Sequence, residues 1–295
     1  MKATLNIDKL DIERRIGLSG KFTSPHKFLA LLFATSLTIG MAVGLSFFPA
    51  SWHSDTPLGI VTQRGLIPYF TLLGFNWGIM LLLMKSRKIS AQRKAIKFLE
   101  EHKFSDHGFH ADNAKEWMTW LNASFKSPHD FILVNRLYSA FASLNALRDP
   151  SALPGVVSSH AESDEIQSDE SYAFPSMLLF LIPILGFIGT VIGLSQSIGG
   201  FGAALSQNTE DITNLIASLQ NVTGGLSVAF DTTLFALLCA LLLQLYFSMI
   251  RSKESHFYED CTGFFQKSFF PNIIHPSQQT SSQKDDDAKK KPTEG

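Results

Sequence analysis

The chain has 295 residues, with 25 Lys and Arg against 26 Asp and Glu, so its formal net charge is −1. The charges lie in blocks between long apolar runs, which is typical of a membrane protein and argues against nucleic-acid binding. The sequence has no phosphate-binding loop, no Gly-x-Ser-x-Gly elbow and no zinc-binding helix with paired histidines. We therefore expect no enzymatic activity, no metal site and no cofactor.

Two apolar runs in the N-terminal third are predicted to be transmembrane helices, because about 20 apolar residues span the hydrocarbon core. They cover residues 27–49 and 65–84. Lys and Arg are frequent before the first run and after the second, whereas the loop between them holds only Arg64. The positive-inside rule therefore places the N-terminal segment, residues 1–26, in the cytoplasm.

Residues 85–150 are predicted to form a small helical cytoplasmic domain. Apolar side chains recur at helical spacing in three stretches, namely Ile89, Ile96 and Leu99, then Ala114, Trp117, Met118, Leu121 and Phe125, then Phe131, Val134, Tyr138, Phe141 and Leu144. Residues 151–172, rich in Ser and acidic residues, show no such spacing and are predicted to be a mobile linker. Near the C-terminus we predict a cytoplasmic helical extension over 251–275 and a disordered tail over 276–295.

The third predicted span, residues 173–202, lies in a stretch without any charged side chain. Small and hydroxyl-bearing residues follow the spacing i, i+4, i+7 and i+11 along one helical face, and these are Gly186, Thr190, Gly193 and Ser197. Pro183 and Gly189 lie in the same segment. A neighbouring helix or a water-filled lumen explains such a face, because small residues let backbones approach closely.

The fourth predicted span, residues 222–250, repeats the small-residue pattern with Gly225, Ala229, Thr232, Ala236 and Ala240. It also contains Asp231, and an ionisable residue costs about 2.5–3.5 kcal/mol to insert into a membrane. Two interpretations of Asp231 stay open. It is either a structural carboxyl paired with Asn76 or with a hydroxyl, or a group that handles ions. On a helical wheel it lies away from the arc that holds Ala229, Thr233 and Ala236.

The segment PILGFIGTVIG from Pro183 to Gly193, an outer turn, and then GLSVAFDTTLFAL from Gly225 resemble the paired helices of the MotA/TolQ/ExbB proton channel family. The resemblance covers about residues 174–251. It implies an all-α, polytopic membrane protein, of which five copies form a ring whose third and fourth spans surround two single-span helices of a partner subunit. In that family the partner helices carry the essential aspartate.

Residue by residue, the threonines of the two family motifs fall on Thr190 and Thr233, so the resemblance implies that these residues line the ion pathway, with Thr232 beside them. Two departures from the family pattern are visible. Asp231 occupies a position that is usually apolar or small, and Phe235-Ala236 replaces a pair that usually ends in Gly. The four spans with both termini inside suit a MotA-like arrangement.

We therefore expect a homopentameric, ring-forming subunit of an ion-driven motor in the bacterial inner membrane, working with two copies of a single-span partner that carries an intramembrane Asp. The transported ion is H⁺ or Na⁺, since threonine oxygens suit either. A second hypothesis is a non-conducting membrane scaffold that assembles through its small-residue helices and recruits cytoplasmic proteins. A neighbouring reading frame for a single-span protein with an intramembrane Asp would favour the motor.

Overall fold

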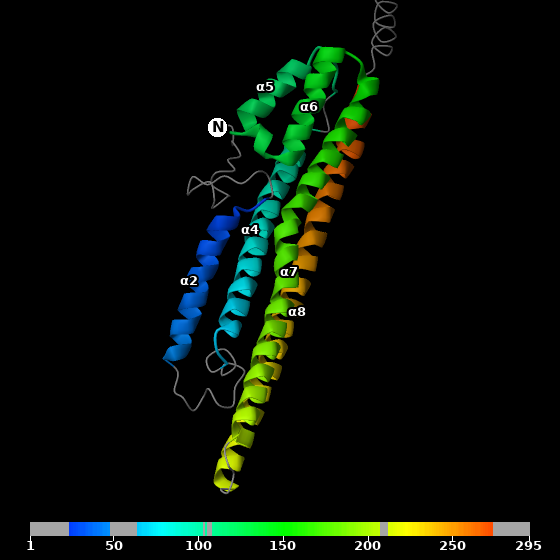
Figure 1. Cartoon of the computed structure of the whole chain (residues 1–295). Helices are drawn as coiled ribbons and strands as arrows, with labels where there is room; N and C mark the ends of the chain where they lie inside the picture. The colour runs from blue at the N-terminus through cyan, green and yellow to red at the C-terminus, as the bar shows by residue number, and fades with distance from the viewer. Residues whose placement is uncertain (1–23, 48–63, 103, 105–107, 207–211, 274–295) are drawn as a thin grey trace, which may run out of the picture. The chain divides into compact units, whose positions relative to one another are not determined.

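The computed structural model describes residues 24–47, 64–102, 104, 108–206 and 212–273 (Figure 1). The predicted N-terminal segment up to residue 23 and the predicted tail over 276–295 lie outside these residues. The chain divides into two compact units. The membrane unit consists of Pro25–Lys85 and Tyr172–Arg251, and the insert unit consists of Met1–Ser24, Ser86–Ser171 and Ser252–Gly295.

In the part of the chain that the structure describes, four helices are long and apolar enough to cross a membrane. They are α2 (Lys27–Ser46), α4 (Ile67–Glu101), α7 (Leu153–Ser206) and α8 (Ile212–Phe264). The described residues contain no β-strand beyond one isolated bridge between Phe109 and Ile273. This confirms the predicted all-α fold of a polytopic membrane protein with four candidate spans. Because α4, α7 and α8 exceed the length of about 20 residues that one crossing needs, each contributes to both units.

Within the membrane unit, α2 packs on α4 through apolar contacts and one buried hydrogen bond. Ala30 of α2 and Leu81 of α4 form a buried cluster with Leu178 of α7. Asn76 of α4 donates from its Nδ2 to the Thr38 Oγ1 on α2 over 3.0 Å. A polar side chain in a membrane segment needs such a partner, because lipid offers none.

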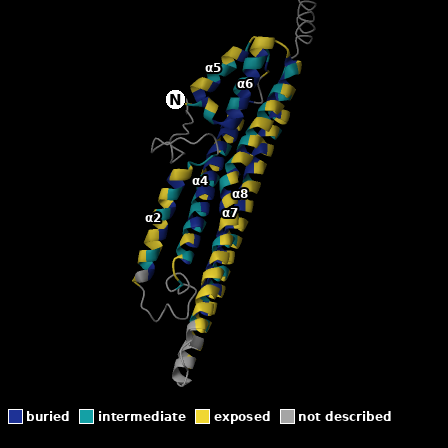
Figure 2. Cartoon of the chain, viewed as in Figure 1, coloured by how far each residue is buried: buried dark blue, intermediate teal, exposed yellow. Residues whose placement is uncertain are grey.

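Many residues along α7 and α8 are exposed in the isolated chain (Figure 2), and large apolar residues are among them. Clear examples are Phe180, Phe187 and Ile198 on α7 and Phe230 and Met249 on α8, all at least 65% exposed. Soluble monomers rarely expose contiguous apolar patches of this kind. The exposed faces of α7 and α8 are therefore suited to lipid or to neighbouring subunits.

The insert unit is built around a core of aromatic side chains. Its own helices are α5 (Ala114–Ser124) and α6 (Ile132–Leu147), which lie where the second and third apolar stretches predicted helices. The first stretch is not a separate helix, because α4 continues without a break to Glu101. Beyond α8 the chain forms a π-helical turn (Phe265–Phe269) and a 3₁₀ turn (Phe270–Asn272). The buried aromatic residues of this core include Phe104, Phe109, Phe141, Phe265 and Phe269.

The predicted mobile linker over 151–172 is wrong, because these residues belong to the first turns of α7 and to the 3₁₀ turn just before it. Asp149 caps that turn by accepting a hydrogen bond from the Ser151 backbone N–H over 2.9 Å. The helical period exists, since Val157, Ser168 and Tyr172 are buried at spacings of 11 and 4 residues, while the acidic residues other than Asp164 are exposed. The prediction missed it because one of the buried positions is a polar serine.

Candidate functional site

The predicted small residues bring the backbones of α7 and α8 into close contact. A Cβ atom on Gly186 would lie 2.6 Å from the Ala236 Cβ, and one on Gly193 would lie 2.7 Å from the Ala229 nitrogen. Both distances are shorter than real Cβ atoms tolerate. A hydroxyl also crosses this interface, since the Ser197 Oγ donates to the Val222 carbonyl on α8 over 2.9 Å.

Two further predicted packing residues, Gly189 and Gly225, extend this interface. A Cβ atom on Gly189 would lie 2.8 Å from the Thr232 Cβ, and one on Gly225 would meet the Ser197 side chain. Pro183 lies inside α7 one turn before Gly186. Because proline has no backbone N–H, the carbonyl of Leu179 lacks its usual helical donor there.

Thr190 of α7 and Thr233 of α8 meet across this close approach, and their hydroxyl oxygens contact each other. Thr233 Oγ1 lies 3.0 Å from the Gly186 carbonyl oxygen and 3.1 Å from that of Ala229. Thr190 Oγ1 lies 3.2 Å from the same Gly186 oxygen. Each threonine hydroxyl carries only one proton but has more than one oxygen within reach as an acceptor. The two hydroxyls can therefore exchange hydrogen-bond partners. The site is a cluster of four oxygens, two from side chains and two from backbone carbonyls.

Thr232 touches the Thr190–Thr233 cluster only at the Ala229 carbonyl oxygen, which lies 3.1 Å from its hydroxyl. Its side chain is buried against Gly189, and its hydroxyl donates within its own helix to the Val228 carbonyl over 2.9 Å. Thr232 therefore packs the α7–α8 interface.

Asp231 forms an ion pair with Arg64, with 2.8 Å between the Asp231 Oδ2 and the Arg64 Nη2. Ser227 bridges the pair, because its Oγ accepts from Arg64 over 2.9 Å and donates to Asp231 over 3.1 Å. Gly65, with a φ of 82°, makes the turn between Arg64 and the start of α4. The prediction that Asn76 pairs with Asp231 is wrong, because the Asn76 amide donates to Thr38. The alternative prediction of a hydroxyl partner is confirmed, and this partner is Ser227.

Sequence reasoning had not linked Arg64 to Asp231. The available signal was that Arg64 is the single Lys or Arg between the first two predicted spans and directly precedes the second. Both side chains are about a quarter exposed, at 27% and 28%. The negative charge of Asp231 is therefore balanced by Arg64, which lies just before α4 in the membrane unit. Thr233, two residues further along α8, contacts α7 instead.

A second ion pair, in the insert unit, was also missed. Arg136 of α6 donates from its Nε to the Asp164 Oδ2 on α7 over 2.6 Å, and the Arg136 side chain is only 1% exposed. Burial raises the pKa of Asp164 above its ordinary value, and the hydrogen bond and charge of Arg136 oppose that rise. The sequence carried a signal, because Arg136 falls on the helical face of the buried residues Leu133, Leu137 and Ala140.

Tyr258 of α8 packs beside the Arg136–Asp164 pair. The Arg136 guanidinium lies over its ring at 5.7 Å, and burial raises the pKa of its hydroxyl. Burial also raises the pKa of the nearby Cys261 thiol to about 12, which keeps it protonated and unreactive at neutral pH. Among the described residues, no group of three or more His, Cys, Asp or Glu side chains is placed to hold a metal ion.

The comparisons with known proteins identify the central part of the chain. The model of the MotA/TolQ/ExbB proton channel family matches residues 129–261, which include α6, most of α8 and all of α7. This segment, somewhat less than half of the chain, is similar to that family. No curated protein and no solved structure matches the chain. The matched segment contains Thr190, Thr233 and Asp231, whereas Arg64 lies outside it.

Proposed function

We propose that the chain is the ring-forming subunit of an ion-driven motor in the bacterial inner membrane, with five copies surrounding two single-span partner helices that carry an intramembrane Asp. The ion is H⁺ or Na⁺, and its passage past that Asp moves the partner within the ring. The family match supports a proton-channel-type subunit. The observation that carries the proposal is the meeting of the Thr190 and Thr233 hydroxyls at the α7–α8 contact.

The chemistry of this contact suits the passage of a partner carboxylate. A protonatable carboxylate near the middle of a membrane needs hydroxyls that can donate or accept, without a fixed charge that would hold it in place. The hydrogen-bond partners described for Thr190 and Thr233 are hydroxyl and carbonyl oxygens. Asp231 has its own cation in Arg64 and belongs to a different contact. Repetition of the threonine pair around a ring would give the partner carboxylate a set of equivalent binding positions.

The test is ion flux through the complex reconstituted with its partner subunit. We expect Thr190→Val and Thr233→Val each to keep assembly and to lower the flux, because valine nearly preserves the shape but removes the hydroxyl. Thr223→Val is the matched control. Thr223 lies on the same helix as Thr233, is exposed, and donates only to carbonyls of its own helix, Leu219 and Gln220.

The same variants separate the motor from the alternative function, a non-conducting scaffold that assembles through α7 and α8 and recruits cytoplasmic proteins. Wild-type flux in an assembled Thr190→Val/Thr233→Val complex would exclude the hydroxyls from the ion pathway. A complex with no partner-dependent flux even before substitution would favour the scaffold. Loss of the assembled complex in the double variant would show that the threonines serve packing.

A further inference from the structure

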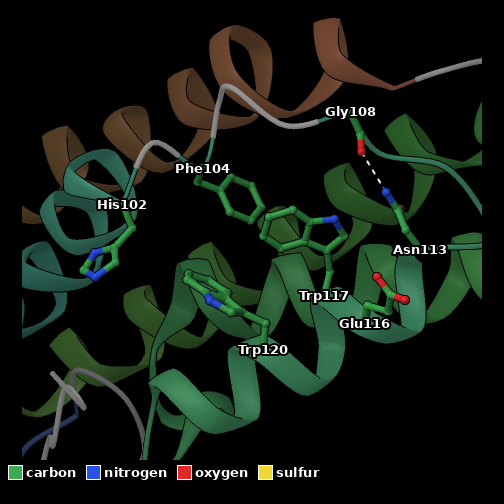
Figure 3. A pocket seen from close by; sticks show the side chains of 7 residues that line it. All are labelled: His102, Phe104, Gly108, Asn113, Glu116, Trp117 and Trp120. Atoms are coloured by element: carbon green, nitrogen blue, oxygen red, sulfur yellow. Dashed lines mark hydrogen bonds between the residues drawn. The ribbon is translucent and has the colours of Figure 1, made fainter. Parts of the chain in front are cut away.

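A pocket of ≈ 620 Å³ opens in the insert unit, separate from the threonine cluster (Figure 3). One side is formed by His102, Phe104 and Gly108, which lie between the end of α4 and the start of α5. The other side is formed by α5 and the residue before it. Its volume lies in the range of about 300–1,000 Å³ that is usual for ligand sites.

The wall on the α5 side is a single helical stripe. Asn113, Glu116, Trp117 and Trp120 follow the spacing i, i+3, i+4 and i+7, so their side chains point to one face. Trp117 packs against several rings of the core. It stacks on Phe141 with 10° between the ring planes and meets Phe104 edge-on with 5.2 Å between the ring centroids. Trp120 lies 5.6 Å from Trp117. The pocket therefore has aromatic walls that are fixed by the core of the insert unit.

Some polar groups around the pocket already have partners, such as His102, whose Nδ1 lies 2.9 Å from the Phe98 carbonyl oxygen. Asn113 is fully engaged, because its Oδ1 accepts from the His110 N–H over 3.0 Å and its Nδ2 donates to the Gly108 carbonyl over 2.8 Å. Within the described part of the chain, the Glu116 carboxylate and the Trp120 indole N–H have no hydrogen bond or ion pair. Asn113 therefore stabilises the edge of the pocket. Glu116 offers a negative charge to a ligand, and the Trp120 indole N–H offers a hydrogen-bond donor.

We propose that this pocket binds a peptide segment of a partner protein through an arginine side chain. A guanidinium is planar and positively charged, so it can pair with Glu116, while the methylene stem of the arginine packs along the tryptophan rings of the same helical stripe (Figure 3). The Trp120 Nε1–H can donate to a carbonyl of the peptide backbone. Charge complementarity and the aromatic walls favour arginine over an apolar side chain, which would leave Glu116 without a partner in the pocket.

The probe is a synthetic peptide, acetyl-Gly-Arg-Gly-amide, added to the full chain in detergent micelles after labelling with fluorotryptophan. The fluorine NMR signals of individual tryptophans are assigned with Trp→Phe variants. We expect the Trp117 and Trp120 signals to shift in a saturable way, while the signal of Trp77, in the membrane unit, stays unchanged. The same peptide with Gln in place of Arg should give no saturable shift. An equal response to the two peptides, or no saturable shift at Trp117 and Trp120, would overturn the proposal.

Two variants locate the binding groups. Glu116→Gln is expected to weaken binding of the arginine peptide roughly fivefold, in line with an exposed charge pair. Trp120→Ala is expected to weaken it about tenfold, because a ring that packs along the arginine stem is lost. Glu165→Gln is the matched control, since Glu165 is an exposed carboxylate of the same unit outside the pocket. Unchanged binding in Glu116→Gln, which alters only an exposed side chain, would show that the pocket does not read the charge.

Discussion

Two aspartates in this protein are each held by an arginine from elsewhere in the same unit. Asp231 pairs with Arg64 in the membrane unit, and Asp164 pairs with Arg136 in the insert unit. Removal of one partner of a desolvated pair leaves an uncompensated charge, which costs more than removal of both. Each pair therefore makes a distinct prediction at the scale of single residues.

For Asp231 we expect Asp231→Asn to assemble and to conduct as the wild type does, because the amide can still bond to Arg64 and Ser227. Asp231→Leu leaves Arg64 without its anion and should lower the free energy of unfolding by about 1–2 kcal/mol, less than for a buried pair because both groups are a quarter exposed. Flux assays and thermal unfolding measure the two effects. An assembled but silent Asp231→Asn complex would mean that Asp231 titrates during transport.

For the second pair we expect Arg136→Met to lower stability by about 3–5 kcal/mol near neutral pH. The loss of Arg136 removes the guanidinium whose hydrogen bond and charge oppose the rise in the pKa of Asp164. A carboxyl whose pKa is raised in the folded state contributes stability below its ordinary pKa, and this contribution is lost as the pH rises through the folded pKa. The defect should therefore shrink on acidification.

Thermal unfolding of the variant at several pH values measures this change. The double variant Arg136→Met/Asp164→Leu serves as the control, because it removes both charges and should be less destabilised than the single variant at neutral pH. A defect of the same size at every pH would contradict the assignment to Asp164.

At the scale of elements, the contact between α7 and α8 depends on glycines that admit the facing backbone. Gly193→Ala would place a Cβ atom 2.7 Å from the Ala229 nitrogen, so the helices must move apart. We expect a loss of about 1–3 kcal/mol, as for other overpacked sites. Gly199→Ala on the same helix meets no atom within 4 Å and should be neutral or stabilising within the single chain. The measurement is the thermal midpoint of both variants, and equal midpoints would disprove the close contact.

At the scale of the whole molecule, the exposed apolar faces of α7 and α8 suit a closed ring of identical subunits. Heterologous interfaces generate a ring when the rotation between neighbours closes, and a ring can enclose a partner helix that a symmetric dimer cannot. We expect intact-complex mass measurement in mild detergent to give a pentamer. A monomer or a dimer as the stable species would contradict the ring.

The sequence by itself showed the apolar runs, the charge blocks and the motifs at Thr190 and Thr233. Hydropathy, helical spacing and family motifs are properties of residues that are close together in the chain. They were enough to predict an all-α membrane protein with four candidate spans and its family. Tertiary structure alone decided that Arg64 pairs with Asp231 and that Arg136 pairs with Asp164. These features depend on side chains that are far apart in the chain and meet only after the helices have packed, so no local pattern could specify them.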